Sequence, residues 1–226
     1  MTQIKQISKA LDDSLKSDSL ETVTVELVES LSESMLNDGL LKDIPIIGTL
    51  VGLTKTGINI KDRLFVKKIL TFLFNINNVS AEKRTEMIEK IDANSKYKIK
   101  VGEKLLYIID KCEDHEKAKL IGILFSAFLN KFIDYSEFLK ASKVIENSLL
   151  EDIEWFVMHD FESLYIEEAA DYVNCGLFEI TPISLSIEEV RALTFDKGAE
   201  YTIKGGKIET KITSIGKLIR KILRES

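Results

Sequence analysis

The feature that most restricts the fold of this 226-residue chain is the segment AKLIGILFSAFL, residues 118–129. Placed on a helix, its hydrophobic side chains cover almost every side: Leu120, Ile121, Ile123, Leu124, Phe125, Phe128 and Leu129. Such a helix needs other elements around it, and it is too short to cross a bilayer, which takes about 20 apolar residues. The segment therefore predicts a central helix inside a multi-helix core.

Composition indicates an ordered chain in a reducing compartment. Charged residues make up 30% of the chain, the net charge is −6 and there are only two prolines, so long disordered linkers are not expected. Cys112 and Cys175 are too few for a disulfide framework. The N-terminus, MTQIKQISKALDDSL, has acids and lysines where a signal peptide needs a continuous apolar region. We expect a cytoplasmic protein.

Residues 40–57, LLKDIPIIGTLVGLTKTG, are rich in hydrophobic and small residues. Their uninterrupted apolar part, residues 44–53, is about half as long as a membrane-spanning helix. Gly48, Gly52 and Thr56 recur at every fourth position, which forms a stripe that another helix can approach closely. Glycine inside a helix costs about 1 kcal/mol relative to alanine, so packing must offset that cost. We predict a short buried hairpin formed with residues 58–76.

Residues 58–76 predict an amphipathic helix with a basic side. Its apolar face holds Ile58, Phe65, Ile69, Phe72 and Ile76, and its basic residues are Lys61, Arg63, Lys67 and Lys68. Such a helix can lie on an anionic lipid surface or pack on a protein core, and periodicity alone does not separate the two. We favour the core and keep the membrane surface as the alternative. The glycine stripe and the four basic residues are candidate interaction residues.

The run DIPIIGTLVGLTKTGINIKDRLFVKKILTFL, residues 43–73, resembles the signature of an uncharacterised family of small bacterial helical proteins. In that signature a D-I-P-x-x-G segment precedes a charged R/K-D-x-L-F-x-K-K helix. The resemblance covers residues 38–160. Members of the family resemble accessory proteins of mobile-element and phage-defence loci. The resemblance implies a fold and such an association, and it brings no catalytic residue.

Three motifs that could carry chemistry are incomplete. NKFIDYSEFL ends like a calcium-binding EF-hand loop, but Lys131 stands where that loop requires glycine, and Asp134 and Glu137 instead predict a helix capping box. Cys112 and His115 have a C-x-x-H spacing without the two further ligands of a zinc site, so we expect a surface cysteine and histidine. KGGK, residues 204–207, lacks the first glycine and the hydroxyl residue of a Walker loop. We expect no catalysis, no metal and no cofactor.

The last part of the chain changes its period. DFESLYIEEAADYVNCGLFEI predicts a helix that ends at Gly176 and a short strand after it. AEYTIKGGKIETKIT predicts a hairpin that turns at Gly205 and Gly206, and SIGKLIRKIL returns to a helix. This order of elements resembles a winged helix with a C-terminal extension.

The charges of this unit disfavour specific DNA binding. The helix that would enter the major groove, residues 160–175, carries Asp160, Glu162, Glu167, Glu168 and Asp171 and no lysine or arginine. Basic residues gather instead near the end of the chain: Lys204, Lys207, Lys211, Lys217, Arg220, Lys221 and Arg224. This tail can hold nucleic acid without sequence specificity or dock an acidic partner. We rank protein recognition above DNA regulation.

The sequence therefore predicts a mainly α fold with a multi-helix core and a small α+β, winged-helix-like C-terminal unit. We divide it into an N-terminal helical segment (1–37), a helical core (38–159) and the C-terminal unit (160–226). We expect a non-catalytic protein-interaction or sensing module in a bacterial cytoplasm, with a protein partner or a homo-oligomer. The alternatives are a peripheral membrane-surface effector that uses the 40–76 hairpin and a winged-helix DNA-binding regulator.

Overall fold

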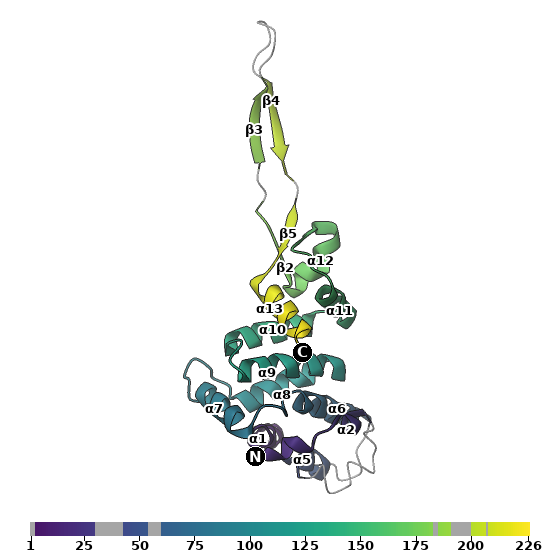
Figure 1. Ribbon diagram of the computed structural model, residues 1–226, viewed down its shortest axis with the longest axis vertical. Coiled ribbons are helices and arrows are strands. Elements are labelled where there is room, and N and C mark those ends of the chain that lie inside the picture. The colour runs from purple at the N-terminus through teal and green to yellow at the C-terminus, as the bar shows by residue number, and fades with distance from the viewer. Residues whose placement is uncertain (1–2, 30–42, 54–59, 183–184, 191–199, 207) are drawn as a thin grey trace.

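The computed structural model describes residues 3–29, 43–53, 60–182, 185–190, 200–206 and 208–226, and all structural statements concern these residues. They form a mainly helical body with a small antiparallel sheet at the C-terminal end, as the sequence predicted. A β-hairpin projects from the end of the body that lies away from the N-terminus (Figure 1). The helices of the body are α1 (Gln3–Lys16), the 3₁₀ turn η1 (Asp18–Thr22), α2 (Val25–Glu29), α5 (Pro45–Leu53), α6 (Ile60–Phe74), α7 (Ala81–Asp92), α8 (Val101–Lys111), α9 (His115–Leu129), α10 (Tyr135–Asn147) and α11 (Leu150–Met158).

Helix α9 is the centre of the body, which confirms the prediction from its all-round apolar surface. It packs against α6 on one side and against α10 and the C-terminal helix α13 (Ser214–Arg224) on the other. Gly122 allows the close approach to α6, because a Cβ atom there would lie 2.9 Å from the carbonyl oxygen of Phe72 and 2.8 Å from the Cβ of Asn75. Gly122 therefore lets α9 pack closely against the end of α6.

Side chains cap the helices where the sequence indicated. The Asp134 carboxylate accepts a hydrogen bond from the Glu137 amide and the Glu137 carboxylate accepts one from the Asp134 amide, both at 2.8 Å, so the predicted capping box is confirmed. Ser80 caps α7 and Asp114 caps α9 in the same way, through the amides of the third helical residue. These caps fix the starts of three core helices, α7, α9 and α10.

Helix α5 does not pair mainly with α6, so the predicted hairpin between the two segments is wrong. Its chief neighbour is α1, where the buried Ser14 hydroxyl accepts a hydrogen bond of 2.9 Å from the Ile46 amide. Gly52 is exposed, and a Cβ added there would meet no atom within 4 Å. The stripe of small residues is therefore not a tight helix contact at that position, and Thr56 lies outside the described residues.

The predicted apolar residues Ile69, Phe72 and Ile76 of the 58–76 segment are buried. Burial is not confined to one face of α6, because all five consecutive residues 69–73 are buried. The ammonium of Lys68 donates to the carbonyl oxygens of Asp110 and Cys112, both at 2.9 Å, and so caps the end of α8. None of the described helices is both long enough and apolar enough to span a bilayer.

Arg84 is an unexpected buried charge in the body. Its guanidinium donates to the carbonyl oxygens of Leu15 at 2.7 Å, of Ser17 at 2.5 Å and of Val79, and no described carboxylate forms an ion pair with it. Burial lowers the pKa of this guanidinium below its ordinary value. The side chain ties the end of α1 to the turn that precedes α7.

The C-terminal unit contains β1 (Ser163–Tyr165), α12 (Ile166–Cys175), β2 (Phe178–Ile180), β3 (Leu185–Val190), β4 (Glu200–Gly205), β5 (Glu209–Ile212) and α13. Strand β5 pairs antiparallel with both β1 and β2, which gives the order β1-β5-β2. The helix predicted over residues 160–175 is thus wrong at its start, because 163–165 form an edge strand. Gly176 ends α12 with a φ of 98°, as predicted.

The hairpin does not turn at Gly205 and Gly206, and that prediction is wrong. Strand β4 pairs with β3 and strand β5 pairs with β2, so the two glycines lie where β4 leads toward β5, along one side of a long hairpin and not at its turn. Extending the pair Ile180–Thr210 by five residues on each strand reaches the pair Leu185–Gly205, which shows that both ladders share one register. Both glycines have positive φ angles, 101° and 88°, at the end of β4. Pro182, which the shared register places opposite Ile208, has no N–H to donate to a ladder.

Candidate interaction surfaces

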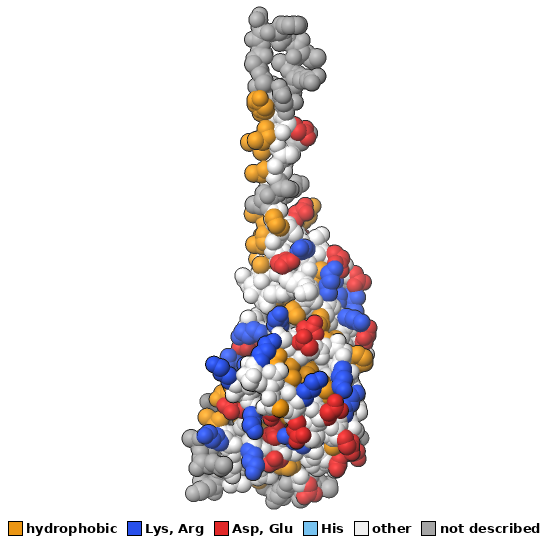
Figure 2. All heavy atoms as spheres, turned by 90° about the vertical axis from the view of Figure 1, so that its left-hand side faces the viewer, with side chains coloured by type: hydrophobic (Ala, Val, Ile, Leu, Met, Phe, Trp, Pro, Cys, Tyr) orange, Lys and Arg blue, Asp and Glu red, His pale blue; other side chains and the backbone are white. Residues whose placement is uncertain are grey.

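The projecting ribbon β3–β4, which we call the arm, exposes one hydrophobic face. Ile187 pairs with Ile203. Leu185 lies two residues before Ile187, and Tyr201 lies two residues before Ile203. All four side chains are on the same face, because side chains alternate in a strand. These four side chains are exposed by 70%, 69%, 64% and 61% respectively. Figure 2 shows hydrophobic side chains in a row along the arm.

Two physical properties make the arm unusual for a free surface. A two-stranded ribbon alone in water is marginally stable at best, because it buries little apolar area. Each strand of the arm also pairs with only one described strand, which leaves an edge of backbone N–H and C=O groups on either side. An apolar face beside open edges is typical of a strand that joins another chain.

A cluster of four aromatic rings covers the junction of α11 and α12. The Trp155 ring stacks on His159, Phe161 and Tyr172 at centroid distances of 4.5, 5.2 and 5.7 Å. Trp155 is 36% exposed and Phe161 40%. Burial and the nearby carboxylates of Asp152 and Asp171 raise the pKa of the Tyr172 hydroxyl, so acids surround this cluster.

Most of the basic residues near the C-terminus form ion pairs or hydrogen bonds within the chain. Lys217 pairs with Glu162 at 2.6 Å, and Arg224 pairs with Asp160 at 2.5 Å and donates to the Val157 carbonyl oxygen. These contacts tie α13 to residues 157–162, which connect α11 to β1. These carboxylates balance the charges of two exposed tail residues, and the use of the tail as a docking surface stays a prediction.

Arg220 is buried and belongs to the same clamp. It is 7% exposed, packs over the Phe156 ring at 4.3 Å and donates to the Phe161 carbonyl oxygen at 2.9 Å. Lys221 is exposed and forms no ion pair with any other described residue. Of the four tail residues proposed as contacts, only Lys221 is thus both exposed and unpaired within the described structure.

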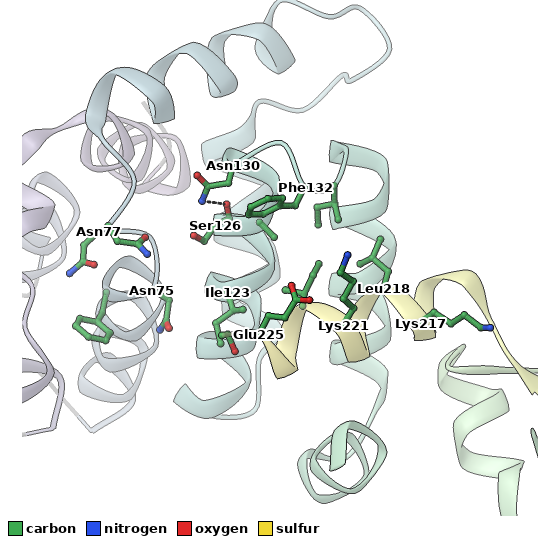
Figure 3. Close-up of a pocket in the computed structure, with 16 residues that line it drawn as sticks. Asn75, Asn77, Ile123, Ser126, Asn130, Phe132, Lys217, Leu218, Lys221 and Glu225 are labelled. Atoms are coloured by element: carbon green, nitrogen blue, oxygen red, sulfur yellow. Dashed lines mark hydrogen bonds between the residues drawn. The ribbon is translucent and has the colours of Figure 1, made fainter. Parts of the chain in front are cut away.

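A groove of about 900 Å³ lies between α13 and the α6–α9 pair. Figure 3 shows Leu218 and Lys221 of α13 with Glu225 after it on one side, and Ile123 and Ser126 of α9 with Asn130 after it on the other. The Asn130 amide already donates to the Ser126 carbonyl oxygen at 3.0 Å and accepts from Lys83 at 2.8 Å. The groove is mainly apolar, and its polar wall is partly occupied by internal hydrogen bonds.

The N-terminal candidate residues do not form one surface. Gly48 is half-buried, Gly52 is exposed and Thr56 lies outside the described residues. Arg63 and Lys67 are half-buried on α6, Lys68 caps α8, and Lys61 lies in α6 with a side chain outside the description. These positions and α13 stand on different parts of the body.

The residues considered for chemistry are held in structural positions. Cys112 is 5% exposed, so the expectation of a surface cysteine is wrong, and burial raises the pKa of its thiol to about 11. His115 is half-exposed and lies 3.4 Å from Glu116. Within the described residues no group of three His, Cys, Asp or Glu side chains could hold a metal ion. A thiol with a raised pKa is a poor nucleophile at neutral pH.

Comparisons with protein-family models, with curated proteins and with solved structures gave no match. The family resemblance of residues 38–160 therefore stays a prediction, and the surfaces described above are the basis for a proposed function.

The arm and the aromatic cluster were not predicted from the sequence. The signal for the arm was present, because LSIE and EYTIK alternate between hydrophobic and polar residues with the period of a strand. Because Gly205 and Gly206 predicted a turn between these residues, the pairing of LSIEEV with EYTIKG was not predicted. The aromatic cluster joins residues 155 and 172 across a strand, and such a contact leaves no periodic signal.

Proposed function

We propose that this protein is a non-catalytic interaction module that presents the arm to a protein partner. The observation that carries the proposal is the exposed hydrophobic face formed by Leu185, Ile187, Tyr201 and Ile203 on a ribbon that stands away from the body. Burial of these four side chains would stabilise a complex by a few kcal/mol, at about 25 cal/mol per Å². A β-ribbon that is marginal alone gains both packing and hydrogen bonds when a partner covers it.

Charge supports a protein partner over DNA. Glu167, Glu168 and Asp171 are exposed on α12, where they would repel phosphates. Two of the cations that could offset this repulsion, Lys217 and Arg224, are paired with Glu162 and Asp160. The proposed location is a reducing compartment such as the cytoplasm, which suits the two free and buried cysteines.

Site-specific photo-crosslinking in the native host tests this function. A photoreactive residue at Ile187 or Tyr201 should capture a protein, while the same residue at Tyr107, which is 43% exposed on α8, should not. The captured protein is then purified and its binding measured directly. Ile203→Ser should weaken binding about tenfold or more, and Ile4→Ser, an exposed change on α1, should leave it unchanged. Equal capture at all three positions would contradict the proposal.

A further inference from the structure

Strand β4 has a sequence that is complementary to itself when two copies run antiparallel. Its residues are EYTIKG, 200–205. When two β4 strands pair about Thr202, Glu200 of one copy stands opposite Lys204 of the other, Tyr201 opposite Ile203, and Thr202 opposite Thr202. All three are pair types that favour antiparallel strands: opposite charges, an aromatic with a β-branched residue, and two threonines.

From this register we infer that two copies of the protein join through the outer edges of β4. The product is a four-stranded sheet in the order β3-β4-β4-β3, with a two-fold axis at Thr202. This inference rests on the proposed function, since it names the partner of the arm as a second copy of the chain. The interface is isologous, so the Glu200–Lys204 and Tyr201–Ile203 pairs each occur twice, and the Thr202 pair lies once on the axis.

The structure leaves this edge of β4 open. In the described part of the chain β4 pairs with β3 alone, and Thr202 faces Glu188 across that ladder. Tyr201, Thr202 and Ile203 are all exposed. The backbone groups on the far side of β4 can therefore accept another strand.

Strand β3 is the less suitable edge. Its sequence, LSIEEV, contains two glutamates and no basic residue. When β3 pairs with a second β3, the new ladder places no lysine or arginine opposite Glu188 or Glu189. Strand β4 supplies a lysine for each glutamate, which selects the β4 edge.

The shape of the molecule permits the pairing. The arm projects from one end of the body (Figure 1). Because the paired β4 strands run in opposite directions, the two bodies lie at opposite ends of the new sheet and do not collide. The pairing also places the two apolar faces side by side, so Leu185, Ile187, Tyr201 and Ile203 of both copies form one surface. A further protein partner would then meet a surface that neither copy has alone.

Charge reversal tests the register. The readout is the dimer dissociation constant of the full chain, measured by analytical ultracentrifugation. Glu200→Lys and Lys204→Glu should each weaken the dimer roughly tenfold, because each change turns two attractive pairs into repulsive ones. The double variant Glu200→Lys/Lys204→Glu should restore it. Mixing the two single variants should give a heterodimer, since both of its charge pairs are then opposite.

Two controls separate the edge of β4 from charge in general. Glu179→Lys and Lys211→Glu alter an exposed ion pair of 3.2 Å at the base of the same hairpin, and neither should change dimerisation. Thr202→Cys should form an intermolecular disulfide on oxidation, because directly opposed residues have Cα atoms about 4.5–5.5 Å apart. Ser186→Cys, on β3, should not.

The outcomes also separate this inference from the proposed function. A chain that is monomeric at every concentration, or a dimer indifferent to the charge of residues 200 and 204, overturns the self-pairing. Capture of a different protein by the arm of a monomeric chain overturns the self-pairing and leaves the proposed function standing. A dimer with the predicted charge dependence supports both.

Discussion

The guanidinium of Arg220 lies 4.3 Å from the centroid of the Phe156 ring while it donates to the Phe161 carbonyl oxygen. This relationship joins the last helix of the chain to the connection between α11 and β1. The Nε atom of Arg220 is buried with no hydrogen-bond partner among the described atoms, and this cost offsets part of the stability gained from the two contacts. Arg220 is thus a positioning residue for the aromatic cluster and not an exposed contact.

Arg220→Met should lower the free energy of unfolding by about 1 kcal/mol, because it removes a cation–π contact and a charged hydrogen bond while it relieves the buried Nε. Trp155 is the only tryptophan of the chain, so its fluorescence should report the release of Phe161 by a shift to longer wavelength. Lys221→Met, an exposed change on the same helix, should alter neither measurement. An unchanged emission spectrum in Arg220→Met would argue against the clamp.

Arg84→Met should be more damaging, with a loss of about 3 kcal/mol in denaturant unfolding. The substitution keeps most of the side-chain volume but leaves the buried carbonyl oxygens of Leu15, Ser17 and Val79 without their donor. Lys90→Met, an exposed change on the same helix, is the control and should cost less than about 0.5 kcal/mol. Equal stabilities of the two variants would show that the guanidinium does not link α1 to α7.

Two glycine substitutions should have opposite signs. Gly122→Ala places a Cβ atom 2.9 Å from a backbone oxygen of α6, so α6 and α9 must move apart and the protein should lose about 1–3 kcal/mol. Gly52→Ala meets no atom within 4 Å on an exposed side of α5 and should gain up to about 1 kcal/mol from helix propensity. Thermal unfolding of both variants measures the difference. A stabilised Gly122→Ala protein would contradict the close packing.

Cys112 should make stability fall in alkaline solution. Burial raises the pKa of its thiol from 9.0 to about 11, so the unfolded chain releases this proton first. The stabilisation is complete below pH 9 and is lost as the pH rises from about 9 to about 11, with a total of roughly 2–3 kcal/mol. Cys112→Ala should remove this part of the pH dependence, as measured by urea unfolding at a series of pH values. A parallel decline in both proteins would assign the loss to other groups.

Sequence patterns predicted those parts of the fold in which burial is local and periodic. The all-round apolar surface of residues 118–129 located the central helix, and Asp134 with Glu137 located a helix start to the residue. The position of Gly176 at the end of α12 also followed from its chemistry, because only a residue that tolerates positive φ ends a helix in this way.

The parts that failed depend on contacts between distant residues. A buried Arg84 gives no signal in the sequence, since its partners are backbone oxygens up to 69 residues away. The ion pairs of Lys217 and Arg224 could not be predicted because their acids, Glu162 and Asp160, lie far earlier in the chain. For the arm, two glycines at positive φ imitate a turn, whereas the pairing of Leu185 with Gly205 continues the register that pairs Ile180 with Thr210.

The shared register of the two ladders limits how the arm can change in length. Adding one residue to each strand beyond Leu185 would move every later side chain to the other side of the ribbon, and the hydrophobic row would be split between two faces. Adding two residues to each strand restores the alternation. Chains related to this one that keep the same hydrophobic row should therefore carry arms whose lengths differ by multiples of four residues. A survey of arm lengths in their sequences would test whether one face of the arm is kept for binding.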